Sequence, residues 1–212
     1  MGMHICIILL KQYHLLTKAF TPDTMPPSGS VLSHCPPEYV AFYRQPAGKE
    51  HYRLLEVLAS KLKHGVVVDL GTLYGLSALA LSSNPRLEVW TYDITNHIPA
   101  DASIRLIPNI SFRLKNGLHA IPDFVERTGL IVLDVDPHDG IQEKQCVDLL
   151  VQHGYKGMLV CDDIHLNDAM EAWWNAVELP KRDVTHEGHH SGTGIIYFDG
   201  IVELSVSPAQ NQ

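Results

Sequence analysis

The chain has 212 residues, of which 45% are hydrophobic and 19% are charged, and its formal net charge at pH 7 is −8. This composition is typical of a folded globular protein, and the length suits a single domain with one sizeable core. The acidic balance and the absence of a Lys/Arg cluster argue against nucleic acid as the main partner, because binding phosphates requires concentrated positive charge. We therefore expect one domain that acts on a small or neutral partner.

The four cysteines form no CxxC pair, which excludes a zinc knuckle or a thioredoxin-type motif; they are Cys6, Cys35, Cys146 and Cys161. The apolar run ICIILL at residues 5–10 is short for a signal peptide and has no basic residue before it, so we interpret it as a buried segment that could contribute to a homodimer. No stretch reaches the roughly eighteen apolar residues that a membrane span needs. These features favour a cytoplasmic protein without a membrane span.

Residues 1–48 are rich in prolines and glycines, in stretches such as TPDTMPPSGS and HCPPEY, and are expected to form an irregular arm or lid before the main domain at residues 49–212. From Lys49 to Lys63, leucines recur at helical spacing and predict one amphipathic helix. Gly65 is expected to end that helix.

Five continuous apolar runs follow and are predicted to be strands: VVVDLG at 66–71, LEVWTYD at 87–93, ISFRLKN at 110–116, LIVLDVD at 130–136 and GMLVCDD at 157–163. Continuous hydrophobicity is typical of parallel strands that are buried on both faces. Helical patterns lie before the fifth run (Cys146, Leu149, Leu150 and His153) and after it (Met170, Trp173, Trp174 and Val177). RDVTHEGHHSGTGIIYFDG at 182–200 instead predicts two strands joined by a polar loop. The fold class is therefore α/β, with a mostly parallel sheet closed by an antiparallel pair.

Polar residues stand at the carboxyl ends of the five predicted strands, where open α/β sheets bind their ligands. They are Asp69, Gly71 and Gly75 after the first strand, Asp93 after the second, Asn116 after the third, Asp134 and Asp136 after the fourth, and Asp162 and Asp163 after the fifth. Carboxylates end four of these five strands. The sequence therefore predicts an acidic site at this edge of the sheet.

The first of these turns has the spacing DxGxxxG rather than the GxGxxG of dinucleotide binders. Its glycines allow close approach of a ligand to the backbone, while Asp69 disfavours a phosphate and favours a cationic or zwitterionic group. Asp93 follows about twenty residues later, where an acidic side chain accepts hydrogen bonds from ribose hydroxyls. The pattern indicates a nucleoside without phosphates that carries a positively charged tail.

From Lys49 to Asp199 the chain resembles the class I S-adenosylmethionine (SAM)-dependent methyltransferases, through VDLGTLYG, Asp93 and a final strand at GIIYFDG. The resemblance implies a Rossmann-like seven-stranded, mostly parallel sheet with helices on both faces and an antiparallel last strand. It also implies that Gly71 and its neighbours contact the amino-acid part of SAM and that Asp93 contacts the ribose. Asn116 and Gly117 would contact the adenine. The implied cofactor-binding set is Asp69, Gly71, Thr72, Gly75, Ser77, Asp93, Asn116, Gly117 and Asp134.

LDVDPHDG and CDDIHLND bring three further carboxylates, Asp134, Asp162 and Asp163, to neighbouring strand ends. Such a cluster is electrostatically costly without a cation, and all-oxygen ligation suits Mg²⁺. The pattern resembles metal-dependent O-methyltransferases, in particular the branch that acts on sugars of macrolide and aminocoumarin antibiotics, which has Asp-x-Asp followed by Asp-Asp. Catechol-type enzymes have a lysine after the first aspartate, where this chain has Pro137 and His138.

Asp136 is the first candidate for the general base, with His138 or His165 as alternatives. A different interpretation is that Asp162 or Asp163 caps the following helix, but Asn167 or Asp168 is better placed to do so. His186, His189 and His190 could bind zinc, although substrate contact or solvation is the preferred interpretation of their loop.

The main hypothesis is a SAM-dependent O-methyltransferase that uses a divalent cation, with a small-molecule or sugar hydroxyl as acceptor. A metal-independent methyltransferase is the alternative. A nucleotide-dependent oxidoreductase or epimerase is disfavoured because GxGxxG and a YxxxK pair are both missing. A noncatalytic Rossmann-like binding module is the third hypothesis.

Overall fold

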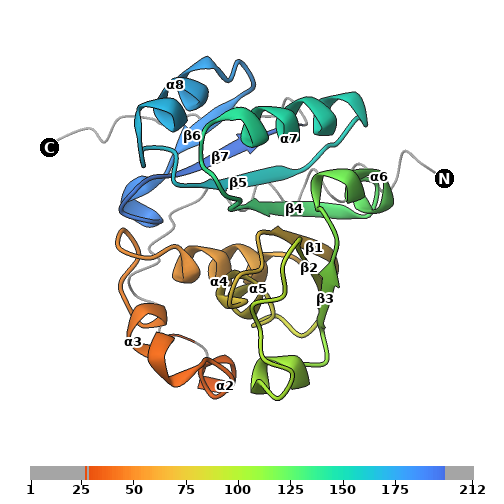
Figure 1. Ribbon diagram of the computed structural model, residues 1–212, viewed down its shortest axis with the longest axis vertical. Helices are drawn as coiled ribbons and strands as arrows, with labels where there is room; N and C mark the ends of the chain where they lie inside the picture. Colours follow the sequence, from red (N-terminus) through yellow and green to blue (C-terminus); the bar gives the residue numbers. More distant parts are fainter. Residues whose placement is uncertain (1–26, 28, 199–212) are drawn as a thin grey trace, which may run out of the picture.

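The computed structural model describes residue 27 and residues 29–198. In this part of the chain, seven strands form one sheet in the order β3-β2-β1-β4-β5-β7-β6 (Figure 1). The strands are β1 (Gly65–Leu70), β2 (Leu87–Asp93), β3 (Ile110–Leu114), β4 (Thr128–Leu133), β5 (Met158–Asp162), β6 (Lys181–Asp183) and β7 (Thr193–Tyr197).

Strand direction in the sheet follows the sequence prediction. β1 pairs in parallel with β2 and β4, β2 with β3, and β4 with β5. β7 lies between β5 and β6 and is antiparallel to both. The predicted Rossmann-like sheet with an antiparallel last strand is confirmed, and the winding reverses between β1 and β4.

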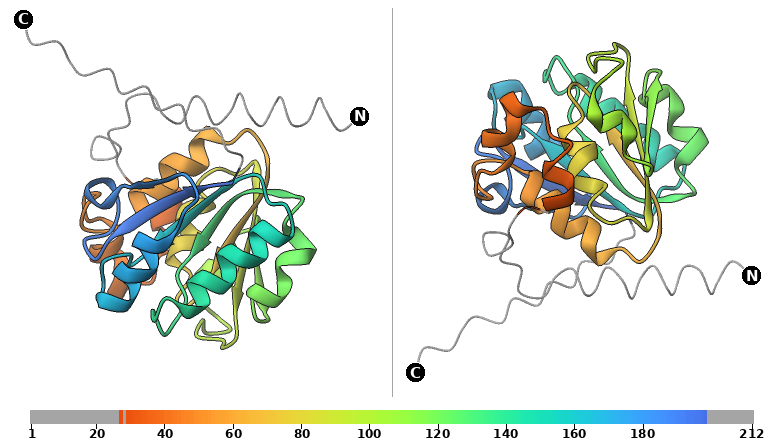
Figure 2. Two further views of the ribbon diagram at one scale, coloured as in Figure 1. Left: turned by 90° about the horizontal axis from the view of Figure 1, so that it is seen from above. Right: turned by 90° about the horizontal axis from the view of Figure 1, so that it is seen from below.

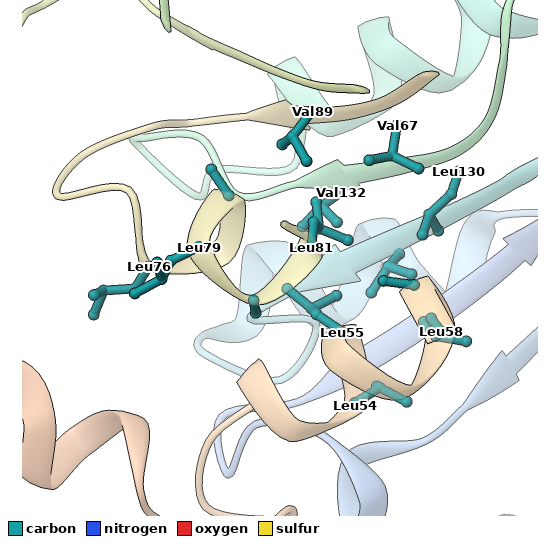
Figure 3. Close-up of a cluster of buried hydrophobic side chains, with 14 of the residues drawn as sticks. Leu54, Leu55, Leu58, Val67, Leu76, Leu79, Leu81, Val89, Leu130 and Val132 are labelled. Carbon is teal, nitrogen blue, oxygen red and sulfur yellow. The ribbon is translucent and has the colours of Figure 1, made fainter. Parts of the chain in front are cut away.

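Helices cover both faces of the sheet, as the sequence predicted (Figure 2). On one face, α4 (Tyr52–Lys61) and α5 (Leu76–Leu81) pack against alternate residues of β1, β2 and β4, including Val67, Val89 and Leu130 (Figure 3). On the other face lie α6 (Ile121–Phe124), α7 (Ile141–Gln152) and α8 (Asp168–Ala176), packed against the intervening strand residues. Alternate side chains of each central strand therefore enter two separate cores, which explains the unbroken apolar runs.

The helix α4 is shorter than predicted. It ends at Lys61 because Leu62 adopts an extended conformation, and Gly65 is the first residue of β1 rather than the end of the helix. Leu54, Leu55 and Leu58 are buried, as their spacing predicted (Figure 3). At α8 the predicted cap is confirmed, because the Asn167 side chain accepts hydrogen bonds from two backbone amides at the start of the helix.

The described part of the predicted arm is helical in short turns. These are α2 (Gly29–Leu32), η2 (Pro37–Tyr39) and α3 (Val40–Tyr43). Val31, Cys35 and Tyr43 are buried in the core that α4 and α5 share with the sheet, and the Tyr43 hydroxyl donates a 2.8 Å hydrogen bond to Glu56. This segment therefore packs into the same core as the main domain. The run ICIILL and Cys6 lie outside the described residues.

Three further single turns are η3 (Ser103–Leu106), η4 (Leu118–Ala120) and η5 (Thr185–Glu187). Cys146, Cys161, Trp173 and Trp174 are buried. Over residues 29–198, the helices are all too short or too polar to cross a bilayer.

Candidate active site

A pocket of about 280 Å³ opens at the carboxyl ends of β1, β2, β3 and β4, beside the point where the winding reverses. This is where open α/β sheets bind their ligands. Its lining combines apolar side chains with polar groups: Leu70, Gly71, Leu73, Tyr92, Asp93, Ile94, Thr95, His97, Asn116, Gly117, Leu118, Asp134, Val135, Asp136, His138 and Gln142. Seven of the predicted site residues therefore share one pocket, namely Gly71, Asp93, Asn116, Gly117, Asp134, Asp136 and His138.

Asp93 ends β2 and lines this pocket. Its Oδ2 accepts a 2.9 Å hydrogen bond from the amide of Leu73, and its Oδ1 accepts one of the same length from Thr95. A carboxylate offers about four acceptor positions, so each oxygen can accept a further hydrogen bond. Asp93 thus joins the loops after β1 and β2 and keeps acceptor capacity for a ligand hydroxyl.

Residue 71 must be a glycine because the ends of β1 and β4 pack closely against each other there. Its φ is +104°, and a Cβ at this position would lie 1.5 Å from the carbonyl oxygen of Asp134. The amide of Asp134 in turn donates to Leu70 O at 2.9 Å. The glycine therefore allows the ends of β1 and β4 to meet, which brings Asp134 to the pocket wall.

Asp69 is completely buried below the pocket lining. Its Oδ2 accepts a 2.7 Å hydrogen bond from Thr91, whereas Oδ1 has no partner among the described residues. Burial raises the pKa of Asp69 to about 7, although the Thr91 hydrogen bond acts in the opposite direction. Asp69 does not line the pocket, so its contact with a cofactor stays a prediction.

Other members of the predicted cofactor set lie away from the main pocket. Thr72 lines a second, smaller pocket and its hydroxyl lies 2.5 Å from that of Thr91. Gly75, with φ +81°, starts α5 and packs against Ile104. Ser77 is buried, and its Oγ lies 3.0 Å from Nε2 of His51. Their contact with a cofactor stays a prediction.

One group of possible metal ligands comprises Asp134, His138 and Asp163, whose donor atoms all lie within 4.8 Å of one another. Nε2 of His138 is 3.7 Å from Oδ1 of Asp134 and 3.6 Å from Oδ2 of Asp163. His138 (φ +53°) and Asp163 (φ +58°) both hold left-handed backbone conformations, which are uncommon for non-glycine residues and cluster at functional sites. Burial, followed by the negative charge of Asp162, raises the pKa of Asp134 to about 7.

A second group comprises His51, Asp162 and His189. Nδ1 of His51 lies 3.1 Å from Oδ2 of Asp162, and Nδ1 of His189 lies 3.2 Å from Oδ1 of the same carboxylate. Burial alone would raise the pKa of Asp162, but the two imidazoles hold it well below its usual range. Against the opposing effect of burial, Asp162 raises the pKa of His51 to about 8, and Asp162 and Asp163 raise that of His189 to about 10.

The three predicted metal ligands are thus divided between two adjoining groups. Asp134 and Asp163 accompany His138, whereas Asp162 lies between His51 and His189. Asp163 connects the groups, because its Oδ1 lies 3.4 Å from Nδ1 of His189 and its Oδ2 faces His138. Binding of a single ion by all three aspartates stays a prediction.

The three candidates for the general base have different surroundings. The Asp136 side chain is 97% exposed at the pocket rim, with Oδ1 3.7 Å from Nε2 of His138. His138 is only 15% exposed and lines the pocket itself. Nε2 of His165 lies 2.8 Å from Oδ2 of Asp183, a residue of β6, and His165 is not part of the pocket lining. Position therefore favours His138 or Asp136 over His165.

The three histidines predicted in the β6–β7 loop, His186, His189 and His190, have different surroundings. His186 is exposed and pairs with Glu187, and His190 contacts the carbonyl of Lys49, so only His189 of the three belongs to a possible metal group.

The sequence interpretation missed Glu50, His51 and Glu143, which are all buried around these groups. An available signal was the position of Glu143, three and seven residues before Cys146 and Leu150 on the buried face of α7.

No protein-family model matches the chain, and no curated protein sequence is significantly similar to it. Solved structures do match its fold. A methyltransferase from Geobacter sulfurreducens superposes with a TM-score of 0.59 at 13% identity, over 82% of this chain and 93% of that one. The SAH-bound methyltransferase PaMTH1 of Podospora anserina gives 0.57 at 13% identity, over 80% and 88%.

The O-methyltransferase TomG of Streptomyces achromogenes, which is involved in tomaymycin synthesis and was solved with SAM, gives a TM-score of 0.55 at 15% identity, over 82% of this chain and 92% of that one. Each match spans most of both chains. The chain therefore has the Rossmann-like fold of the class I SAM-dependent methyltransferases.

Proposed function

We propose that this protein is a SAM-dependent O-methyltransferase that transfers a methyl group to a hydroxyl of a sugar, with the help of a divalent cation. The observation that carries the proposal is the pocket itself. It runs from Asp93 and Asn116, at the ends of β2 and β3, to Asp134 and His138 beyond β4. One cavity thus joins a nucleoside-type site to an acidic group suited to an acceptor.

The residues present fit the cofactor. Asp93 has acceptor capacity for the ribose hydroxyls, and the apolar side chains of Ile94 and Leu118 offer surfaces for the adenine. Among the described residues, the pocket lining contains aspartates but no lysine or arginine, which suits a cationic cofactor rather than a phosphate. Gly71 brings the backbone of β1 to the same cavity.

The donor set also fits a divalent cation. Asp134, Asp163 and His138 supply two carboxylates and one imidazole within bonding reach of a common centre. A bound ion would lower the pKa of an acceptor hydroxyl and fix its position. Carboxylates suit Mg²⁺ or Mn²⁺, and the remaining coordination positions would be available to the acceptor.

Residues of the chain would then orient the acceptor and take its proton. Transfer is an in-line displacement, so the hydroxyl oxygen would have to lie opposite the sulfur of SAM. The pocket wall at Asp134, which both ligands would share, would hold them next to each other. Asp136 at the rim is free of a metal role and is our first candidate for the base. His138 takes that role if it does not bind the ion.

The sugar acceptor rests on the resemblance of the aspartate pattern to sugar O-methyltransferases and on the polarity of the rim. Asp136, Gln142 and His97 present polar groups at the pocket. Such groups suit an acceptor with several hydroxyls better than a flat apolar phenol.

The proposal is tested by titrating SAH into the protein calorimetrically and by screening transfer of a labelled methyl group to sugar and phenolic acceptors, with and without EDTA. Transfer to a sugar hydroxyl that EDTA abolishes is expected, as is its loss in Asp134→Asn and Asp163→Asn. Transfer that resists EDTA and both substitutions would instead support a metal-independent methyltransferase. Binding of NAD without binding of SAH would contradict the proposal.

A further inference from the structure

His51, Asp162 and His189 form a buried group that the proposed methyl transfer does not use. The three residues come from distant parts of the chain: His51 precedes α4, Asp162 ends β5, and His189 lies in the loop between β6 and β7. His51 and Asp162 are 4% and 6% exposed. One nitrogen from each histidine and one oxygen from the aspartate lie within 4.8 Å of one another.

Both histidines turn the same atom, Nδ1, toward Asp162. Their other nitrogens have separate partners: Nε2 of His51 lies 3.0 Å from Oγ of Ser77, and Nε2 of His189 lies 3.8 Å from Oε2 of Glu50. In metal sites, a ligating histidine characteristically uses its second nitrogen in this way, with a hydroxyl, carbonyl or carboxylate that fixes the tautomer. Binding of an ion at Nδ1 would require hydrogen at Nε2 of each ring, and Ser77 and Glu50 offer oxygens on that side of the rings.

Without an ion, the polar atoms of this group are poorly satisfied. Nδ1 of His51 is fully buried and makes no hydrogen bond of good geometry within the described part of the chain, despite its 3.1 Å approach to Asp162. Nδ1 of His189 has three oxygens within 3.4 Å, from Asp162, Asp163 and Ser191, and one N–H can satisfy only one of them well. A cation would bond both nitrogens and the carboxylate at once.

Charge is compatible with an ion at this position. Without one, Asp162 and Glu50 are balanced by His51 and His189, because, against the effect of burial, the nearby carboxylates raise the pKa of both imidazoles. A divalent ion that replaces the two protons keeps this balance of buried charge. Two imidazoles with one carboxylate favour a borderline transition metal such as Zn²⁺ over Mg²⁺, which prefers a set dominated by oxygen ligands.

We propose that His51, Asp162 and His189 bind a Zn²⁺-class cation, at a second site adjoining the group of Asp134, His138 and Asp163. Glu50 and Ser77 are the residues that orient its two histidines. Asp163 lies between the two sites, with one oxygen near His189 and the other near His138. The cluster at the end of β5 would then hold two ions of different preference rather than one.

The test uses the full chain without a histidine tag, stripped of metal by a chelator and supplied with excess Mg²⁺. Zn²⁺ content is measured by mass spectrometry after equilibrium dialysis, and Co²⁺ is titrated as a spectroscopic probe. We expect one tightly bound equivalent of Zn²⁺. His51→Gln and His189→Gln should each weaken Zn²⁺ binding by at least about tenfold, which is the lower end of the effect of losing a residue that only orients a ligand.

Two matched controls should bind Zn²⁺ like the wild type. His186→Gln changes an exposed histidine of the same loop, and His138→Gln changes the adjoining group. Nitrogen-15 NMR of the protein labelled at histidine tests the same point without a variant. On addition of Zn²⁺, the ring-nitrogen signals of two histidines should change to those of rings that bind metal at Nδ1 and carry hydrogen at Nε2.

Three results would overturn the proposal. The first is an absence of Zn²⁺ and Co²⁺ binding by the folded wild type. The second is binding that survives both His51→Gln and His189→Gln. The third is a single ion lost in Asp134→Asn and Asp162→Asn but kept in both histidine variants, which would favour one site built from aspartates. Because metal content is measured without substrate, a failure of methyl transfer would leave this result intact.

Discussion

Oε1 of Glu143 lies 3.9 Å from Nδ1 of His138, across from the carboxylates that face Nε2 of the same ring. Glu143 is 2% exposed, and neither of its oxygens has a hydrogen bond of good geometry among residues 29–198. Burial raises its pKa. A buried carboxylate at one imidazole nitrogen orients the ring and fixes which nitrogen carries hydrogen. We therefore regard Glu143 as a positioning residue for His138.

If the proposed function is correct, Glu143→Gln should lower kcat by about 10- to 100-fold and leave the affinity for SAH unchanged, because Glu143 does not line the pocket. Steady-state kinetics and calorimetry separate the two effects. Glu171→Gln, on the exposed face of α8, is the control and should have no effect. Equal loss of SAH binding and kcat would indicate a general structural role instead.

Asp93→Ala should weaken SAH binding by about 10- to 100-fold, because hydrogen bonds to a charged group each contribute about 1.5–3 kcal/mol. Calorimetric titration measures the change. Asp123→Ala is a suitable control, since that carboxylate is 58% exposed and pairs with Lys115 on the surface. An unchanged affinity in Asp93→Ala would show that the nucleoside does not bind at the end of β2.

Gly71→Ala should prevent folding or destabilise the protein by more than about 3 kcal/mol, because its Cβ would overlap the carbonyl of Asp134. Gly154→Ala is the control that measures backbone strain without steric overlap. Gly154 also has a positive φ, +66°, but apart from its chain neighbours no described residue has an atom within 4 Å of the position that its Cβ would take. The control substitution should cost about 1–2 kcal/mol. Urea denaturation of both variants checks the difference, and similar losses would contradict the close contact.

The stability of the protein should contain a contribution from Asp69 that falls as pH rises. The pKa of Asp69 is about 7 in the folded chain and near 3.8 when unfolded, so between these values the folded state binds more protons. This stabilisation is complete below pH 4 and is lost by pH 7, with a magnitude on the order of 2–4 kcal/mol.

Asp69→Asn removes the titration and keeps an acceptor for Thr91. The difference in free energy of unfolding between variant and wild type should therefore shift in favour of the variant from pH 5 to pH 8, as measured by urea denaturation without cofactor. A difference that stays constant with pH would show that Asp69 is ionised in the folded protein throughout this range.

Much of the fold could be predicted from the sequence alone. The unbroken apolar runs at β1 and β4 indicated strands buried on both faces, and the lack of a helix between the last two strands indicated the antiparallel pair. The same patterns placed Asp93, Asn116 and Asp134 at one edge of the sheet, because the carboxyl ends of parallel strands lie together. Strand periodicity and strand ends are local properties, which a sequence expresses directly.

Only the tertiary structure decided which side chains meet at that edge. Asp162 and Asp163 are adjacent in the chain, yet Asp162 contacts His51 and His189 while Asp163 also faces His138. His51 reaches Asp162 from the position just before α4. His189 lies near Asp162 because β7, which follows its loop, inserts between β5 and β6. Such contacts depend on how distant elements pack and on the direction in which each side chain leaves the backbone, and neither is contained in the local pattern of residues.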